Sequence, residues 1–343
     1  MRRITGVSFT SVEICAGAGG QAIGLHEAGF EHLALVEYDA DACRTLRHNG
    51  EPLGWAPRVH HADVRAWEPS AELRNVTLVS GGVPCPPFSI AGKQLGHDDE
   101  RDLFPALIDL VETLTPRAVQ AENVRGLLSK KFEPYRHAIE RRLSHLGYVT
   151  MWRLIIASDC GVPQLRPRTI MVALRPDDAA HFDWPTPAEA PPPTVGQTLF
   201  ESIAAGGWEG AAEWASAADS IAPTLVGGSR KHGGADLGPT RAKRAWSRIG
   251  VDGHGLANEV PAPGFVGSPK ITVQQAALLQ GFPPSWEIQG RKTSAYRQVG
   301  NALPPPVARA VGQSLAAAFQ AADKAGLVGA SGVSVATKKA AAA

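Results

Sequence analysis

The chain has 343 residues, 44% hydrophobic and 20% charged, and its net charge of +1 neither requires nor excludes a polyanionic partner. The composition is that of an ordinary globular protein, long enough for one large domain and a smaller one. No apolar run approaches the roughly 20 residues of a membrane span. The start also lacks the apolar stretch of a signal peptide, so we expect a cytoplasmic protein.

The first 175 residues alternate short apolar runs with amphipathic stretches. Strands are predicted where β-branched and apolar residues gather, and helices where apolar residues recur every three or four positions. The predicted strands are 11–16, 33–38, 76–82, 118–123, 149–157 and 169–175. The predicted helices between them are 20–30, 39–49, 102–114 and 134–148. This alternation predicts an α/β fold with a doubly wound, mostly parallel sheet.

The pattern changes after about residue 182, where "DWPTPAEAPPPTVG" is rich in proline and the next ninety or so residues are rich in glycine. Regular helical spacing returns at 271–282 and 305–322. We therefore expect a first domain over 1–184, completed by the C-terminal segment 295–324. A smaller, loop-rich domain and hinge would occupy 185–294, and a disordered tail would follow at 325–343.

A glycine-rich loop, "EICAGAGGQAIG", follows the first predicted strand and opens the first predicted helix. Gly17, Gly19 and Ala22 have the spacing of a nucleotide-binding turn, and Glu37 lies twenty residues after Gly17, at the end of the next strand. Such a carboxylate suits a ribose diol. Asp63, after a third strand, is placed to accept from an adenine amino group. The loop alone fits NAD, S-adenosylmethionine (SAM) or a turn without ligand.

A second group of polar side chains accompanies Cys85, which stands between two prolines in "GGVPCPPFSIAGKQ". Glu122 ends another predicted strand, and neighbouring parallel strands open into one crevice at their carboxyl ends. Arg166 and Arg168, in "QLRPR", add positive charge that would favour a thiolate. The pattern indicates a cysteine nucleophile. The four cysteines include no Cys-x-x-Cys pair, so we expect neither a metal site nor a disulfide framework.

These motifs together resemble the DNA (cytosine-5)-methyltransferases. The matching segments occur in that family's order, over about residues 11–175 and 271–315. They are "EICAGAGG", "VEYD", "ADV", "PCPPFSIAGKQ", "AENVRGLL", "GVPQLRPRT", "QQAALLQGFPPSW" and "QVGNALPPPVARAVG". The glycine loop alone is weak evidence, whereas the Pro-Cys-x-x-Phe-Ser motif is specific. The resemblance implies a Rossmann-like SAM-dependent methyltransferase sheet with a smaller, loop-rich target recognition domain.

The resemblance also implies a mechanism. The Cys85 thiolate would add to carbon-6 of a flipped-out cytosine, so that carbon-5 can attack the methyl group of SAM. Glu122 would bind or protonate the ring nitrogen N3. Arg166 and Arg168 would hold the base carbonyl oxygen, the Glu122 carboxylate or a phosphate. The sequence leaves open which arginine binds which of these groups.

The same resemblance implies the cofactor site. Gly17, Gly19 and Gly20 would lie beside the methionine part of SAM. Glu37 would bind the ribose hydroxyls, and Tyr38 would stack on adenine. Cys15 stands where the family usually has phenylalanine, which removes one stacking face. The other implied cofactor residues are Asp63, Pro84, Leu103 and Asn301.

DNA contacts are expected mainly from the middle domain. Ser89 would lie near the flipped strand, and Gln164 would contact DNA or orient the two arginines. "IAPTLVGGSRKHGG" resembles the family's recurrent Thr-Leu segment, from which basic side chains would reach the DNA. The implied residues of this segment are Thr224, Arg230 and Lys231. The residues expected to bind the DNA backbone are Arg241, Lys243, Arg244 and Arg248.

Three alternatives to a DNA methyltransferase remain. The substrate could be tRNA, although the Cys-Phe-Thr element of that branch is absent. The chain could be a catalytically silent DNA-binding relative, or an NAD-dependent oxidoreductase, which would leave "PCPPFS" without a role. If the chain is a DNA methyltransferase, we expect a monomer that acts on double-stranded DNA at the nucleoid. A cognate restriction endonuclease would act separately.

Overall fold

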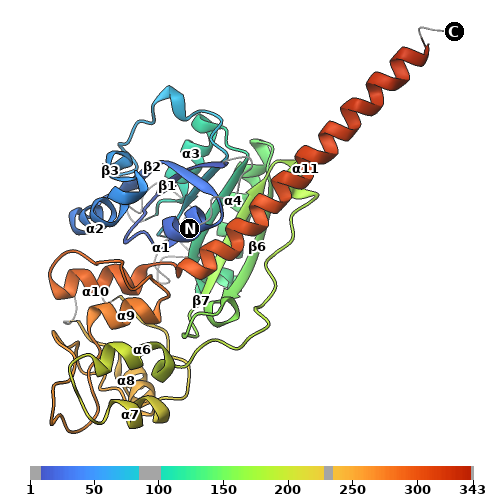
Figure 1. Ribbon diagram of the computed structural model, residues 1–343. Coiled ribbons are helices and arrows are strands. Elements are labelled where there is room, and N and C mark those ends of the chain that lie inside the picture. The colour runs from blue at the N-terminus through green and yellow to red at the C-terminus, as the bar shows by residue number, and fades with distance from the viewer. Residues whose placement is uncertain (1–8, 85–101, 228–234, 341–343) are drawn as a thin grey trace.

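The computed structural model describes residues 9–84, 102–227 and 235–340, with side chains as far as residue 326. A single mixed sheet lies at the centre, with strand order β3-β2-β1-β4-β5-β7-β6 (Figure 1). Its strands are β1 (Phe9–Ile14), β2 (Phe30–Glu37), β3 (Val59–His61), β4 (Leu78–Gly81), β5 (Ala118–Val124), β6 (Val149–Ile156) and β7 (Pro167–Leu174).

The first five strands of the sheet are parallel, whereas β7 runs antiparallel to both β5 and β6. The predicted α/β architecture is confirmed, and the expectation of a mostly parallel sheet holds for this half. The β6–β7 connection spans only residues 157–166 and contains a single 3-10 turn. Because a parallel crossover needs about a dozen residues or more, this short connection forces an antiparallel pair.

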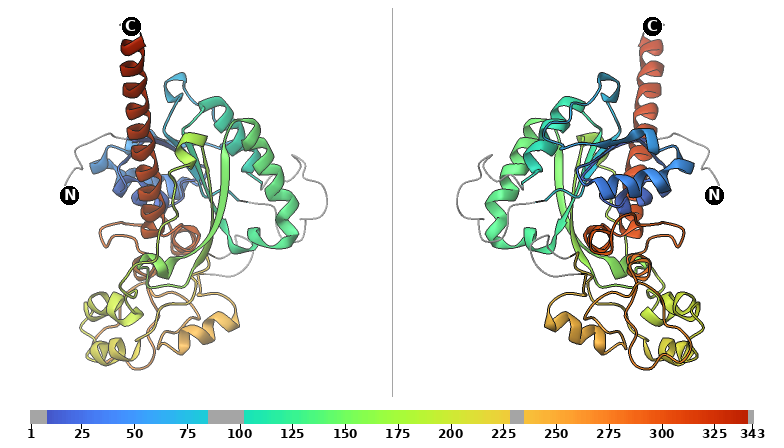
Figure 2. Two further views of the ribbon diagram at one scale, coloured as in Figure 1. Left: turned by 90° about the vertical axis from the view of Figure 1, so that its right-hand side faces the viewer. Right: turned by 90° about the vertical axis from the view of Figure 1, so that its left-hand side faces the viewer.

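Helices cover both faces of the sheet (Figure 2). One face packs on α3 and α4, through an apolar cluster that includes Val12, Val79 and Val119. The other face packs on α1 and the first part of α11, around Phe30 and Phe319. The helices around the sheet, on both faces together, are α1 (Gly20–Glu27), α2 (Ala40–Gly50), α3 (Phe104–Leu114), α4 (Glu133–His145), α5 (Pro176–Ala179) and α11 (Pro305–Ala340).

The middle of the chain forms short helices joined by long loops, which lie beyond the carboxyl edge of the sheet (Figure 1). Thr194 and Thr272 begin α6 and α9 with capping boxes, in which each threonine pairs with a glutamine three residues later. These helices are α6 (Val195–Ala204), α7 (Ala211–Ala217), α8 (Thr240–Ser247), α9 (Val273–Leu279) and α10 (Lys292–Asn301).

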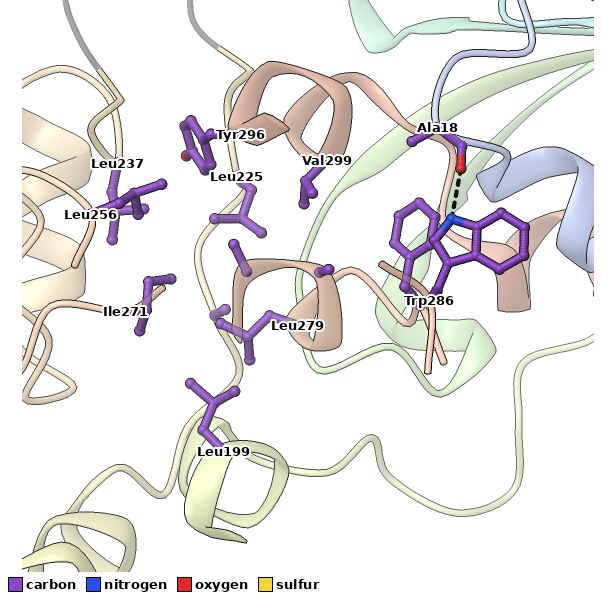
Figure 3. Packing of buried hydrophobic residues seen from close by; sticks show 14 of the residues in the cluster. Ala18, Leu199, Leu225, Leu237, Leu256, Ile271, Leu279, Trp286, Tyr296 and Val299 are labelled. Carbon is purple, nitrogen blue, oxygen red and sulfur yellow. Dashed lines mark hydrogen bonds between the residues drawn. The ribbon is translucent and has the colours of Figure 1, made fainter. Parts of the chain in front are cut away.

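One continuous apolar cluster joins the middle helices to the glycine loop. Leu199, Leu225 and Leu279 pack in this cluster, and Trp286 donates a hydrogen bond from Nε1 to the Ala18 carbonyl oxygen at 2.9 Å (Figure 3). The loop-rich segment is therefore anchored on the residues that open α1.

Helix α11 continues to Ala340, whereas the sequence predicts a disordered tail from residue 325. No proline follows Pro306, so nothing in the sequence prevents propagation of a helix that has already begun. Among the described residues, no helix is both long and apolar enough to cross a membrane.

Candidate active site

A cavity of about 910 Å³ opens at the carboxyl ends of the parallel strands. Its walls come from the glycine loop, the residues that end or follow β2, β3, β4 and β5, and the C-terminal end of α10. The sequence-predicted residues that line it are Cys15, Gly17, Gly20, Glu37, Tyr38, Asp63, Pro84, Leu103, Glu122 and Asn301. The fold therefore gathers most of the predicted cofactor residues around one space.

The Glu37 carboxylate is fixed by two backbone donors. Its Oε2 accepts from the Gly17 amide at 2.8 Å, and its Oε1 accepts from the Asp39 amide at 2.7 Å. Gly17 reaches this position with a φ of 54°, a left-handed conformation that favours glycine. Burial raises the pKa of Glu37, while the Asp39 and Gly17 amides oppose that rise. Each carboxylate oxygen retains acceptor capacity for a hydroxyl donor in the cavity.

The neighbouring cofactor candidates differ in exposure. The Tyr38 side chain is 65% exposed at the rim, so its ring is open to a flat partner. Asp63 accepts from Arg65 Nε at 3.0 Å, and this hydrogen bond lowers the pKa of the Asp63 carboxyl. Burial raises the pKa of the Cys15 thiol, so this residue adds a small neutral wall to the cavity.

Gly19, a predicted cofactor residue, packs behind the cavity wall and is not among the residues that line it. It has a φ of 86°, and an added Cβ would lie 2.9 Å from both Leu46 Cδ2 and Trp286 Cζ2. Its role is to let the loop turn beneath Trp286. Gly20 does line the cavity, and a Cβ there would lie 2.2 Å from the Leu303 carbonyl oxygen.

Glu122 and Arg168 form a nearly buried ion pair at the cavity. Arg168 Nε lies 2.7 Å from Glu122 Oε1, and the two side chains are 12% and 10% exposed. Burial raises the pKa of Glu122, while the positive charges of Arg168 and Arg166 act in the opposite direction. A carboxyl group in this balance can exchange a proton with a bound base.

The backbone ahead of Cys85 passes close to this carboxylate. An added Cβ on Gly82 would lie 3.3 Å from Glu122 Oε2, and Asn123 Nδ2 donates to the Val83 carbonyl oxygen at 2.7 Å. Leu103 N donates to the Pro84 carbonyl oxygen at 3.2 Å. Pro84 and Leu103, which stand on either side of the undescribed segment, are therefore joined at the cavity wall.

Arg166 occupies a different place from its predicted catalytic one. Its side chain is fully buried and donates to the carbonyl oxygens of Leu225 at 2.8 Å, Gly300 at 2.7 Å and Ala302 at 2.7 Å. These three bonds occupy both terminal nitrogens. The structure assigns the Glu122 carboxylate to Arg168, and Arg166 joins the sheet to the middle domain and α10.

Gln164 is also buried, which contradicts its prediction as a DNA contact. Its Nε2 donates to Gln280 Oε1 at 2.6 Å, and its Oε1 accepts from the Leu225 amide at 2.8 Å. The alternative prediction, an orienting role next to Arg166, agrees with these bonds.

The predicted DNA-binding residues divide between those described and those not. Arg241 and Arg244 are exposed on α8, and Arg248, just after that helix, is exposed too, whereas Lys243 pairs with Asp236 at 2.7 Å. Thr224 is half-buried. Cys85, Ser89, Arg230 and Lys231 lie outside the described residues.

The sequence analysis missed several polar residues in the cavity wall. Glu13 and Gln21 line its floor, and Arg297 and Gln298 line the side formed by α10. Glu13 is fully buried, its Oε2 has no hydrogen-bond partner among the described residues, and burial raises its pKa. A carboxylate inside the apolar run "SVEICA" was the available signal, because buried carboxylates are rare unless they are paired.

Comparisons with known proteins show the family of the chain. The family model for C-5 cytosine-specific DNA methylase matches residues 9–234 and 239–317. The chain is 55% identical over 319 residues to the Type II methyltransferase M.NaeI of Lentzea aerocolonigenes, covering 91% of this chain and 76% of that protein. It is 47% identical to the Type II methyltransferase M.NgoMIV of Neisseria gonorrhoeae, and the match covers 92% of this chain and 99% of that protein.

Among solved structures, the fold is similar to a DNMT2 mutant from Spodoptera frugiperda. The TM-score is 0.60 at 18% identity, covering 90% of this chain and 99% of that one, so this match bears on the fold alone. The family match spans most of the described chain, including the glycine loop, Glu122 and Arg168. The chain therefore belongs to the C-5 cytosine-specific DNA methylase family and transfers a methyl group from SAM to carbon-5 of cytosine in DNA.

Proposed function

We propose that the enzyme acts on a cytosine flipped out of a specific duplex sequence, with Cys85 as nucleophile, Glu122 as the acid at N3 and Arg168 as its partner. Carbon-5 of cytosine is a poor nucleophile until a thiolate adds to carbon-6. The observation that carries the proposal is the Glu122–Arg168 pair, 2.7 Å apart beside the backbone that leads into Cys85. Pro84 lines the same cavity, and Cys85 is the next residue in the chain. Consecutive Cα atoms are about 3.8 Å apart, so the chain brings the nucleophile to this cavity.

The environment of Glu122 suits this role. Burial raises its pKa, so the carboxyl can hold a proton for the ring nitrogen as negative charge develops there. Arg168 limits that rise and fixes the carboxyl in place. After carbon-5 has acquired its methyl group, loss of the carbon-5 proton to water re-forms the double bond and releases the Cys85 thiolate.

The residues of the cavity fit SAM. The cavity volume of about 910 Å³ is in the range of small-molecule sites, and the Glu37 carboxylate is fixed with acceptor capacity to spare. When bound, SAM supplies an electrophilic methyl group. In this proposal Glu37 binds the ribose hydroxyls and Tyr38 stacks on adenine. Asp63 accepts from the adenine amino group, and Asn301 closes the side formed by α10.

The division of labour between domains is part of the proposal. Residues 1–184 and 295–324 form the catalytic domain, and residues 185–294 form the target recognition domain and hinge. The exposed Arg241 and Arg244 on α8 bind phosphates. Because the target base is not accessible inside a duplex, it must be flipped out before Cys85 can reach it.

The cellular role follows from the curated relatives, which are named Type II methyltransferases. We propose that this enzyme belongs to a restriction-modification system and protects its target sequence from a separately acting endonuclease. It would act as a monomer in the cytoplasm, on the DNA of the nucleoid.

The assigned roles are tested by trapping the covalent adduct. In duplex DNA that carries 5-fluorocytosine, the fluorine cannot leave as the proton does, so the Cys85 adduct should persist after methyl transfer. Wild-type protein should form a SAM-dependent complex that survives denaturation. Cys85→Ser should form none, and Glu122→Gln should form it about 100-fold or more slowly. An adduct in Cys85→Ser would contradict the assignment of the nucleophile.

A further inference from the structure

Two glycines bring the middle domain into backbone contact with the cavity wall. An added Cβ on Gly300 would lie 2.3 Å from Gly227 Cα and 2.4 Å from Gly227 N. An added Cβ on Gly227 would lie 2.2 Å from Asn301 Oδ1 and 3.0 Å from the Arg297 carbonyl oxygen. Neither position can carry a side chain unless the two backbones separate.

Buried polar side chains hold this joint closed. Arg166 donates both to Leu225, two residues before Gly227, and to the carbonyl oxygens of Gly300 and Ala302. Its guanidinium therefore bonds both sides of the contact from one fully buried position. Loss of this donor would remove its hydrogen bonds to the carbonyl oxygens of Leu225 and Gly300 and weaken the joint.

A pair of glutamines forms a second bridge. Gln164 accepts from the Leu225 amide and donates to Gln280. Gln280 in turn donates to the carbonyl oxygens of Val299 at 3.0 Å and Ala302 at 2.7 Å. Leu225 also packs beside Tyr296 and Val299 of α10 (Figure 3). The joint is thus fixed by backbone, polar and apolar contacts together.

The two sides of the joint face different tasks. On one side, Arg297, Asn301 and Ala302 line the cofactor cavity, and Arg297 pairs with Asp39 at 3.3 Å across its rim. On the other side, Gly227 is the last described residue before the basic segment 228–234. The joint therefore connects the wall of the cofactor cavity to the middle domain.

We propose that this joint couples cofactor binding to DNA recognition, with Arg166 as its positioning residue. Filling of the cavity sets the wall at 300–302, and the wall in turn sets the position of the middle domain. The inference rests on the proposed function, because it takes the middle domain as the part that reads DNA. Gln164, Arg166 and Gln280 link the two sides of the joint and do not line the cofactor cavity.

The test compares Gly227→Ala with Gly255→Ala, a second glycine of the middle domain. A Cβ on Gly255 would meet nothing closer than 3.9 Å, so this variant controls for the substitution itself. Fluorescence anisotropy would measure the Kd for a duplex that contains the target, with and without S-adenosylhomocysteine. We expect this product to tighten DNA binding at least fivefold in the wild type and in Gly255→Ala. The ratio of the Kd without this product to the Kd with it, the coupling factor, should fall toward one in Gly227→Ala. An unchanged factor in Gly227→Ala, or a factor of one in the wild type, would overturn the proposal.

A second variant, Arg166→Lys, keeps the charge but has one terminal nitrogen in place of the two that bond Leu225 on one side and Gly300 and Ala302 on the other. Here we expect a raised KM for DNA and loss of the coupling factor, with kcat at saturating DNA close to the wild-type value. Arg168→Lys should lower kcat and leave the coupling factor intact. A lowered kcat with normal KM and normal coupling in Arg166→Lys would overturn its positioning role. If wild-type enzyme forms no adduct on 5-fluorocytosine duplex, the proposed function fails first and takes this inference with it.

Discussion

Of the described glycines that line the cofactor cavity, Gly20 leaves the least room for a side chain, and this gives a quantitative prediction. In Gly20→Ala the new Cβ would lie 2.2 Å from the Leu303 carbonyl oxygen, so the two walls must separate by about 1 Å to restore van der Waals contact. Overpacking of this kind typically costs about 1–3 kcal/mol, offset by about 1 kcal/mol from the greater helix propensity of alanine. A displacement of about 1 Å at a reacting centre can cost about 100-fold in rate. We therefore expect kcat/KM for SAM to fall by about that factor.

Gly24→Ala is the matched control, on the same helix and against the same C-terminal segment. Its Cβ would lie 2.3 Å from the Pro305 carbonyl oxygen, yet Gly24 does not line the cavity. Urea denaturation should show comparable losses of unfolding free energy in both variants, while initial rates at varied SAM should separate them. Equal catalytic losses in the two variants, or a wild-type kcat/KM in Gly20→Ala, would refute the argument.

Three further predictions concern charge. Glu122→Gln, which cannot exchange a proton, should lower kcat by about 100-fold or more without weakening DNA binding, as measured by single-turnover methyl transfer; an unchanged rate would contradict its role as acid. Burial lowers the pKa of His32 from 6.5 to about 4, so the unfolded chain binds the extra proton between these values. The free energy of unfolding should fall by up to about 3 kcal/mol as the pH drops from 6.5 to 4, and His32→Gln should lose that part of the slope in urea melts. Finally, Arg241→Gln and Arg244→Gln should each reduce the slope of log Kd for DNA against log salt by about 1, and unchanged slopes would place these residues off the DNA.

Local patterns predicted the parts of the site that depend on one strand and its following turn. The pairing of Gly17 with Glu37 follows from two adjacent parallel strands, each with its ligand residue at the carboxyl end. Glu122 was placed correctly beside the cavity for the same reason. Periodicity also revealed most of the strands, because buried strands of this fold are nearly continuous apolar runs.

The two arginines show where such patterns fail. Both arginines precede the predicted strand 169–175, and their separate roles stay open in the sequence, whereas the observed β7 begins at Pro167 and therefore includes Arg168. Arg168 is held by the pleat opposite β5, beside Glu122. Arg166 precedes the strand, and its direction is set by carbonyl groups more than fifty residues away in the sequence. No local pattern contains that information.

Gly19 illustrates the same limit. Its place in the glycine motif predicts contact with the cofactor, whereas its small size serves the packing of Trp286 and Leu46. The tryptophan belongs to a segment far along the chain, and it is positioned by a hydrogen bond to Ala18. Contacts between distant segments decide which glycines of the motif face the ligand.

The most direct measurement is transfer of labelled methyl from SAM to mixed-sequence duplex DNA, with Cys85→Ser measured in parallel and the product sequenced after bisulfite treatment. Our account predicts label on cytosine carbon-5 within one recurrent sequence, and none from Cys85→Ser. Label on tRNA in place of DNA, or equal label from the Cys85→Ser protein, would contradict it.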